Sequence, residues 1–200
     1  MLAPHFDILN RLLLAALVLV LCAAESGAEG GSLVPEGFGA ATKGGEGGRV
    51  LWVTTLDVEG PGSITEALDA EGPRVIKFRV AGEIKLSDER KNKLWVGWPH
   101  RPQAKETAGG AMNYDSPHSF VTLDGASAPE PGITFTNGGF YIGYGVHDVV
   151  IRHIRVQHGP VGGASGDGVC VQAKRVLIDH CTITGAVDET ADLSECSDVT

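Results

Sequence analysis

The sequence predicts an all-β protein, a parallel β-helix whose short strands coil around one apolar interior. Three observations predict this fold. Gly accounts for 28 of the 200 residues and charged residues for only 20%, a composition typical of strands and turns rather than of helical bundles. One segment recurs at intervals of about 27 residues. Each copy also contains a break in its strand alternation that a flat sheet would not tolerate.

The repeat is clearest when residues 149–156, VVIRHIRV, are aligned with residues 176–183, VLIDHCTI. The offset of 27 residues superimposes His153 on His180. The segment that begins at Val121 fits the same frame 28 residues earlier, and the final SDVT begins another copy. A period of this size is typical of solenoids, whose units stack on one another.

The apolar pattern within each copy predicts a corner. Val149 and Ile151 share one face of a strand, because side chains alternate with a period of two. Ile154 and Val156 have the opposite parity, so a straight strand cannot bury both pairs on one side. A bend at 152–153 resolves the conflict, and the next copy has the same break. Strand–corner–strand units stacked about 4.8 Å apart build a parallel β-helix. The side chains expected in its interior are Val121, Leu123, Val149, Ile151, Ile154, Val156, Val176, Ile178, Cys181 and Ile183.

The preceding part of the chain predicts strands and one short helix. Residues 49–56 and 74–82 are rich in β-branched residues and predict strands. Between them, Ser63 and Glu66 form a capping box that begins a helix. The Gly-rich residues 36–48 predict an ordered surface loop. No helix follows their glycines in a strand–turn–helix unit, which disfavours a phosphate-binding loop.

Two further segments are less regular. Residues 87–118 are polar and predict a long loop, in which Trp95 and Trp98 either stack on sugar rings or pack locally over the core. Residues 1–28 predict a secretory signal peptide, because their apolar run is too short for a comfortable membrane span. An uncleaved anchor is the alternative.

Cleavage of the signal leaves residues 29–200 as one secreted β-helix domain with no membrane attachment. The formal net charge of −9 makes nucleic acid an unsuitable partner, because phosphate binding needs a basic patch. The cysteines that remain, Cys170, Cys181 and Cys196, match no zinc pattern and cannot all pair within the chain, so we expect free buried thiols.

Several stretches, in their order and spacing, resemble the pectate lyase superfamily, polysaccharide lyases of the family 1 type. EGFGA followed by VTTLDVEGPGSITEAL and GPRVIKFRVAGEI resembles its N-terminal region. VVIRHIRV, VLIDHCTI and DETADLSECSDVT resemble its central coils. The resemblance runs from about Pro35 to Thr200, interrupted by 87–118. It implies a right-handed parallel β-helix, calcium-dependent β-elimination of polyuronates such as pectate, and secretion.

The resemblance also implies site residues. Asp167, Asp188 and Asp192 match the carboxylates that hold Ca²⁺, which bridges to the uronate groups of an acidic polysaccharide. The family's base is an arginine on a later coil, so the catalytic residue of this chain is left unassigned. We therefore expect residues 29–200 to form the N-terminal and central portion of a lyase, incomplete at the C-terminus and with little activity alone.

The acidic stretch DETAD can be tested against calcium chemistry directly. Calcium takes six to eight oxygen ligands. In a straight strand Asp188 and Asp192 would lie roughly 13 Å apart, so the chain must bend near Thr190–Ala191 if they share one ion. Asp167 would join them from the adjacent coil. The alternative is a solvated acidic turn, although a cation would explain how an acidic protein binds an acidic polymer.

Other functions remain open at this point. A β-helical glycoside hydrolase would need paired carboxylates in acid and base roles, and a non-catalytic carbohydrate-binding or surface protein would keep only the scaffold. His153 and His180 are conceivable zinc or catalytic ligands. Their equivalent corner positions instead predict a structural ladder of stacked rings.

Overall fold

The computed structural model describes residues 35–86, 93–96, 115–160 and 166–200. The predicted signal peptide, with Cys22, and Trp98 lie outside the described residues. The chain divides into two units, Met1–Pro35 and Glu36–Thr200, and the fold below is that of the second.

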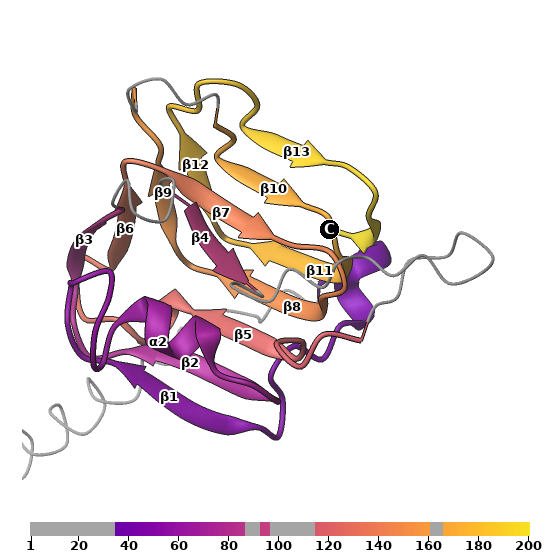
Figure 1. The fold of residues 1–200 in the computed structure, drawn as a ribbon, viewed down its shortest axis with the longest axis horizontal. Coiled ribbons are helices and arrows are strands. Elements are labelled where there is room, and N and C mark those ends of the chain that lie inside the picture. The colour runs from indigo at the N-terminus through magenta and orange to yellow at the C-terminus, as the bar shows by residue number, and fades with distance from the viewer. Residues whose placement is uncertain (1–34, 87–92, 97–114, 161–165) are drawn as a thin grey trace, which may run out of the picture. The chain divides into compact units, whose positions relative to one another are not determined.

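The strands form three parallel sheets (Figure 1). Sheet A has six strands, in the order β1 (Arg49–Val53), β2 (Arg74–Phe78), β5 (Val121–Asp124), β8 (His147–Arg152), β11 (Lys174–Asp179) and β14 (Ser197–Val199). Sheet B contains β3 (Gly82–Lys85), β6 (Ile133–Thr136), β9 (Arg155–Gln157) and β12 (Thr182–Thr184). Sheet C contains β4 (Lys93–Val96), β7 (Gly139–Ile142), β10 (Val169–Val171) and β13 (Ala191–Leu193).

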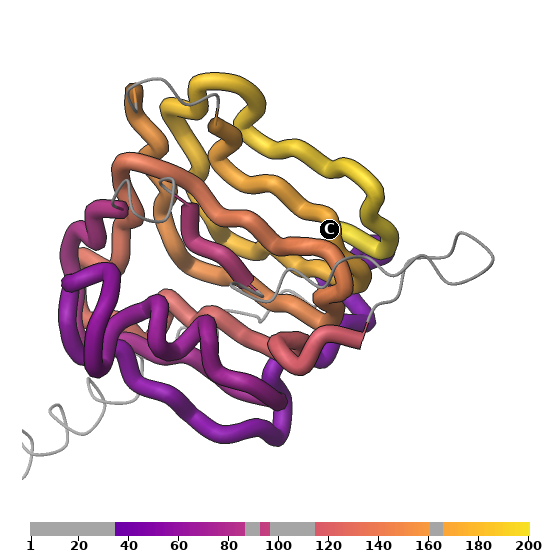
Figure 2. Tube along the Cα trace, in the orientation of Figure 1, coloured from indigo at the N-terminus to yellow at the C-terminus, as the bar shows by residue number. Residues whose placement is uncertain are grey.

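From β2 onwards the chain visits sheets A, B and C in turn and then returns to sheet A one strand further on. Each round is one coil, and the trace in Figure 2 shows the coils stacked along one axis. The predicted fold class, a right-handed parallel β-helix with one short helix near its N-terminal end, is confirmed.

The register of sheet A is the one that the repeat predicts. Val121 pairs with Val149, and Val149 pairs with Val176. In sheet B, Val156 pairs with Ile183. The alignment of 149–156 with 176–183 is therefore a structural alignment of two successive coils.

The predicted corners are also present. Ile151 and Ile154 are both buried although their parities differ, because His153 between them has a left-handed backbone, with φ 55°. His180 occupies the same place in the next coil, with φ 51°. The two rings stack with centroids 4.7 Å apart and planes 23° apart, which confirms the predicted ladder.

The predicted interior is one continuous cluster. Seven of its predicted members are buried, and Ile178, Cys181 and Ile183 are partly buried and pack against them. Phe135 of β6 and Phe140 of β7 meet edge to face, with centroids 5.0 Å apart, where sheets B and C enclose the core.

The short helix α2 (Ile64–Asp69) follows β1, where later coils have strands of sheets B and C. The predicted residues cap the helix: Ser63 Oγ accepts from the Glu66 amide at 3.2 Å, whereas Glu66 Oε2 accepts from the amide of Gly62, one residue before the N-cap, at 2.6 Å. Ile64 and Leu68 are buried, so the helix covers the apolar end of the first coils (Figure 1).

Arg74 of β2 fixes the end of this helix. Its side chain is fully buried, and burial lowers its pKa from 12.5 to about 10, so it remains charged at neutral pH. The charge is solvated by backbone carbonyls instead of water. The acceptors of its hydrogen bonds are the carbonyl oxygens of Ala67, Leu68, Gly72, His118 and Ser119.

The Gly-rich residues 36–48, here named the N-terminal strap, contain the 3₁₀ turn η1 (Phe38–Ala41) and cross the outer face of sheet A. The Gly39 amide donates to Thr200 Oγ1 at 2.9 Å, and the Gly45 amide donates to Thr122 Oγ1 at 2.9 Å. The strap then leads into β1, so the predicted loop runs from the last described coil back to the first.

Strand β4 lies within residues 87–118, the segment predicted as one long loop. That prediction is wrong for Lys93–Val96, which form a strand of sheet C. Leu94 and Val96 are buried while Lys93 and Trp95 are half-buried on the outer side. Four residues give too short an alternation to recognise within a polar segment.

Gly45→Ala should destabilise the protein by about 1–3 kcal/mol, the usual cost of overpacking. A Cβ at Gly45 would lie 1.7 Å from the backbone oxygen of Arg74, and this oxygen cannot move without disturbing sheet A. Gly143→Ala is the matched control, because among the described residues the nearest atom to its Cβ would be the oxygen of Val96, 3.8 Å away. Urea unfolding of both variants tests this, and equal stabilities would contradict the close approach of the strap.

Asp148 is the buried carboxylate that ties the strap to sheet A. Its oxygens accept from Arg175 Nε at 3.0 Å and from Thr42 Oγ1 at 3.2 Å, and it lies 2.7 Å from Nδ1 of His147. Burial alone would raise its pKa, but the hydrogen bonds from Arg175 and His147 outweigh burial and lower the pKa from 3.8 to about 2. The ionised form is therefore stabilised by folding.

Because the folded pKa is below the unfolded one, Asp148 should stabilise the fold fully above about pH 4 and lose this contribution as the pH falls towards 2. Asp148→Asn should be less stable than the wild type at pH 6, and the difference should shrink towards pH 2. Unfolding at several pH values measures it. Arg175→Met should show the same trend, whereas a difference independent of pH would contradict the role of the ionised carboxylate.

Candidate cation site

Two of the predicted acidic residues, Asp167 and Asp188, lie on stacked turns that lead from sheet B into sheet C, and the third, Asp192, lies in β13. Asp167 precedes β10, and Asp188 precedes β13 on the next coil. The turns are joined by their backbones: the Gly168 amide donates to the Glu189 oxygen at 2.9 Å, and the Asp188 amide donates to the Gly166 oxygen at 3.3 Å. Stacking of coils therefore brings carboxylates 21 residues apart in sequence next to each other.

The side chains form two overlapping groups that share Asp167. In one, the oxygens of Asp167, Asp188 and Glu189 lie within 4.8 Å of one another. In the other, Asp167 and Asp192 lie within 4.8 Å of each other and of the Cys170 sulfur. Asp188 therefore belongs to the first group and Asp192 to the second, and Asp167 is common to both.

The expected bend between Asp188 and Asp192 is present but ends one residue early. Thr190 lies in the bend, whereas Ala191 already belongs to β13 and pairs with Val169 of β10. Asp192 is consequently held on the outer side of a strand, and Asp188 and Glu189 are exposed on the preceding turn.

Asp167 is the most buried of these carboxylates, with 9% of its surface exposed. The Tyr141 hydroxyl donates to its Oδ2 at 2.8 Å, and the Glu189 amide donates to its Oδ1 at 3.4 Å. Burial, followed by the bond to Asp167, raises the pKa of Tyr141, so the phenol stays protonated and remains a donor. Tyr141 therefore fixes the orientation of Asp167.

The exposed part of the site is crowded with negative charge. The pKa of the Glu189 carboxyl is raised, first by its hydrogen bond to Asp188 and then by the one to Asp167. Like charges that are close together favour the protonated form. A cation bound among these oxygens would remove that repulsion.

Cys170 borders the site as a thiol and not as a thiolate. Burial, and then the hydrogen bond to Asp192, raise the pKa of its thiol to about 12. Its sulfur donates to Asp192 Oδ2 at 3.3 Å, and Ser194 Oγ donates to the same oxygen at 3.1 Å. Since a protonated thiol is a poor metal ligand, the donors left for an ion are carboxylate oxygens.

An outward-facing row on sheet C leads to this site. Trp95, Tyr141, Cys170 and Asp192 occupy the same register position on four successive strands. The Trp95 and Tyr141 ring centroids are 5.1 Å apart, and the Lys93 ammonium nitrogen lies 3.7 Å from the Tyr141 centroid. Trp95 therefore lies half-buried on the outer face of sheet C, next to the tyrosine that contacts Asp167.

Sequence reasoning had not connected Lys93, Tyr141 and Cys170 with the site. For Tyr141 and Cys170 the available signal was the register position that they share with Asp192, whereas Lys93 lies in β4, within the segment predicted as a loop. Cys170, Cys181 and Cys196 are free thiols, as predicted; Cys170 is buried and the other two are half-buried. In the described part of the chain no helix has both the length and the apolar character to cross a membrane.

The fold and the site together define a parallel β-helix with acidic turns stacked at the entry to one sheet. Among solved structures, the chain matches Jun a 1, the major allergen from cedar pollen, with a TM-score of 0.59 at 20% identity. The match covers 82% of this chain and 46% of that one, and it supports the fold.

No profile of a known protein family matches the chain. It is 31% identical over 160 residues to a probable pectate lyase C of Emericella nidulans and 30% identical over 167 residues to one of Aspergillus fumigatus. These matches cover 80% and 82% of this chain. The chain is therefore a relative of the pectate lyases, as its motifs indicated. It spans about a third of the length of both relatives, 32% and 33%.

Proposed function

We propose that the chain is part of a secreted, calcium-dependent lyase that cleaves polyuronates such as pectate by β-elimination. The observation that carries the proposal is the convergence of Asp188 and Asp192, from two sides, on the oriented carboxylate of Asp167. The relationship to proteins named pectate lyase C supports the substrate class. Secretion rests on the predicted signal peptide of residues 1–28.

The donor set fits calcium better than softer metals. Calcium prefers oxygen ligands and accepts irregular geometries, and here four carboxylates surround the site while the adjacent thiol is protonated. Asp188 and Glu189 are exposed, so water and substrate oxygens can complete the coordination. We assign Asp167, Asp188 and Asp192 as the calcium ligands.

The remaining residues bind and orient the substrate. Tyr141 holds Asp167 in place, while Trp95 and Tyr141 offer aromatic surface to sugar rings along the direction of coil stacking. The Lys93 ammonium, over the Tyr141 ring, supplies positive charge for a uronate carboxylate. A bound calcium ion would stabilise the negative charge that develops on the uronate carboxylate when its α-proton is removed.

Elimination also requires a base. The resemblance places it, as an arginine, on a later coil, and that assignment stays a prediction. The row of Trp95 and Tyr141 equally supports a second candidate function, carbohydrate binding without catalysis. Only the appearance of an unsaturated product separates the two.

Calcium should bind to the chain. The double variant Asp188→Asn with Asp192→Asn should have a calcium affinity at least about 10-fold lower, because each substitution removes a charged ligand. Isothermal titration calorimetry measures the affinity. Asp179→Asn, an acid at a different corner of the β-helix, is the matched control and should leave calcium binding unchanged. Equal affinity in the wild type and the double variant would refute the site.

Polygalacturonate should bind only when calcium is present, because the cation bridges two sets of carboxylates. Lys93→Met should weaken this binding further by removing the second positive charge. Binding is followed by affinity electrophoresis with calcium or with a chelator, and the ultraviolet absorbance of unsaturated ends is recorded in parallel. Binding without absorbance would favour the non-catalytic function, and binding that persists in chelator would contradict the role of calcium.

A further inference from the structure

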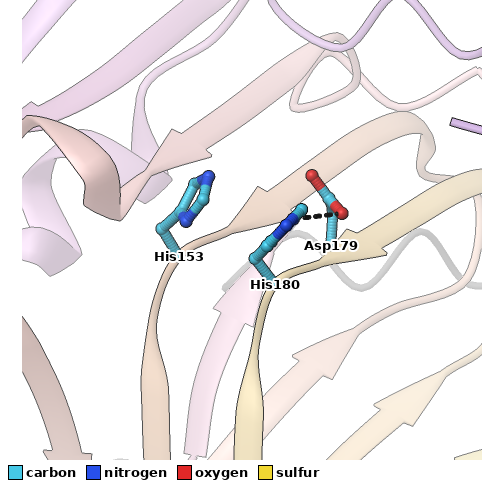
Figure 3. Close-up of side chains that lie close together, drawn as sticks. All are labelled: His153, Asp179 and His180. Carbon is cyan, nitrogen blue, oxygen red and sulfur yellow. Dashed lines mark hydrogen bonds and ion pairs between the residues drawn. The ribbon is translucent and has the colours of Figure 1, made fainter. Parts of the chain in front are cut away.

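A second group of metal-binding side chains lies where sheet A turns into sheet B. His153, Asp179 and His180 each offer a ligand atom, and these atoms lie within 4.8 Å of one another. Figure 3 shows the two imidazoles side by side on successive coils, with Asp179 directed at His180. Asp179 Oδ1 lies 2.7 Å from Nδ1 of His180.

This cluster is open to ions in solution. Both imidazoles are exposed, and they border a cleft of about 300 Å³ that is also lined by Glu130, Arg155 and Thr182. Water molecules can therefore occupy the coordination positions that the protein leaves free.

Arg152, the cation next to Asp179, makes its side-chain hydrogen bonds to Asp124 and interacts with Asp179 only through its charge. Arg152, which pairs with Asp179 in the strand register, directs Nε and Nη2 to the two oxygens of Asp124, each at 3.0 Å. Asp179 instead contacts His180. In a neutral His180 ring, a proton on Nδ1 donated to Asp179 leaves Nε2 free to bind a metal, the arrangement that carboxylates impose on metal-binding histidines.

We propose that His153 and His180 bind a divalent first-row transition metal of the zinc class, with Asp179 as the positioning residue. Imidazole nitrogens suit zinc, copper and nickel, whereas calcium prefers oxygen. A tetrahedral zinc ion with bonds of about 2.0–2.1 Å holds its ligand atoms about 3.3 Å apart. Strand pairing fixes the two backbones, and rotation of the exposed rings brings the nitrogens to that separation.

The bound ion adds a side-chain link between two coils that at this corner are already joined by ring stacking and by the hydrogen bond from the His153 amide to the Asp179 oxygen at 3.1 Å. His153 and His180 both have a left-handed backbone, which Asn and Gly adopt more easily. The free energy of metal binding would offset the cost of this conformation. Zinc should therefore raise the melting temperature of the folded protein, since a ligand that binds only the native state stabilises it.

The test is calorimetric titration of ZnCl₂ into the full chain in excess CaCl₂, which saturates the carboxylates near sheet C. We expect one zinc per chain. His153→Asn with His180→Asn should weaken binding at least 10-fold, because Asn tolerates the left-handed backbone but lacks the imidazole. Asp179→Asn should weaken it several-fold and, with the ligands still present, should not abolish it.

Two controls separate this site from the other. Asp192→Asn should lose calcium affinity and keep zinc affinity, and Cys170→Ser should keep zinc affinity because no thiolate is involved. Circular dichroism confirms that each variant is folded. Zinc affinity that survives loss of both histidines, or that disappears in Cys170→Ser, would overturn the proposal, and neither outcome bears on the calcium site.

Discussion

The structure depends on the in-register parallel pairing of successive coils. Since each backbone stacks on its equivalent, side chains at one position form a row across coils instead of meeting unrelated partners. The apolar interior is such a row, and so are the stacked rings of His153 and His180. The pairs Asp124–Arg152 and Asp148–Arg175 are rows of alternating charge. The candidate cation site arises in the same way, from acids on stacked turns.

A solenoid has contacts only between neighbouring coils, and its ends are its weak points. This chain adds contacts of longer range. The N-terminal strap bonds to Thr122 of β5, to Asp148 of β8 and to Thr200 directly after β14, and thereby connects coils that do not touch. At the N-terminal end, Arg74 holds the last carbonyls of α2 over the core. The strap thus adds contacts along the side of the solenoid, and Arg74 adds them beneath the helix that covers the first coils.

The sequence contained the local and periodic part of this structure. The 27-residue offset predicted the register, and the parity change at His153 predicted the corner, because both follow from alternation along a single strand. The path of the strap and the contact of Tyr141 with Asp167 were not predictable in this way. They join segments whose separation does not follow the repeat, and the strand of Trp95 was concealed in a polar segment.

In-register stacking also explains how one scaffold can present two different sets of metal-binding side chains. The turns that precede β10 and β13 bring carboxylates from successive coils within 4.8 Å of one another, and such a set of oxygens suits a cation with flexible coordination. The corner between sheets A and B is tight, and its repeated left-handed residue aligns two identical rings at a fixed spacing. The pair of imidazoles at this corner suits a transition metal. The proposed difference in metal preference therefore follows from the side chains that the two places present, carboxylates before sheet C and imidazoles at the corner.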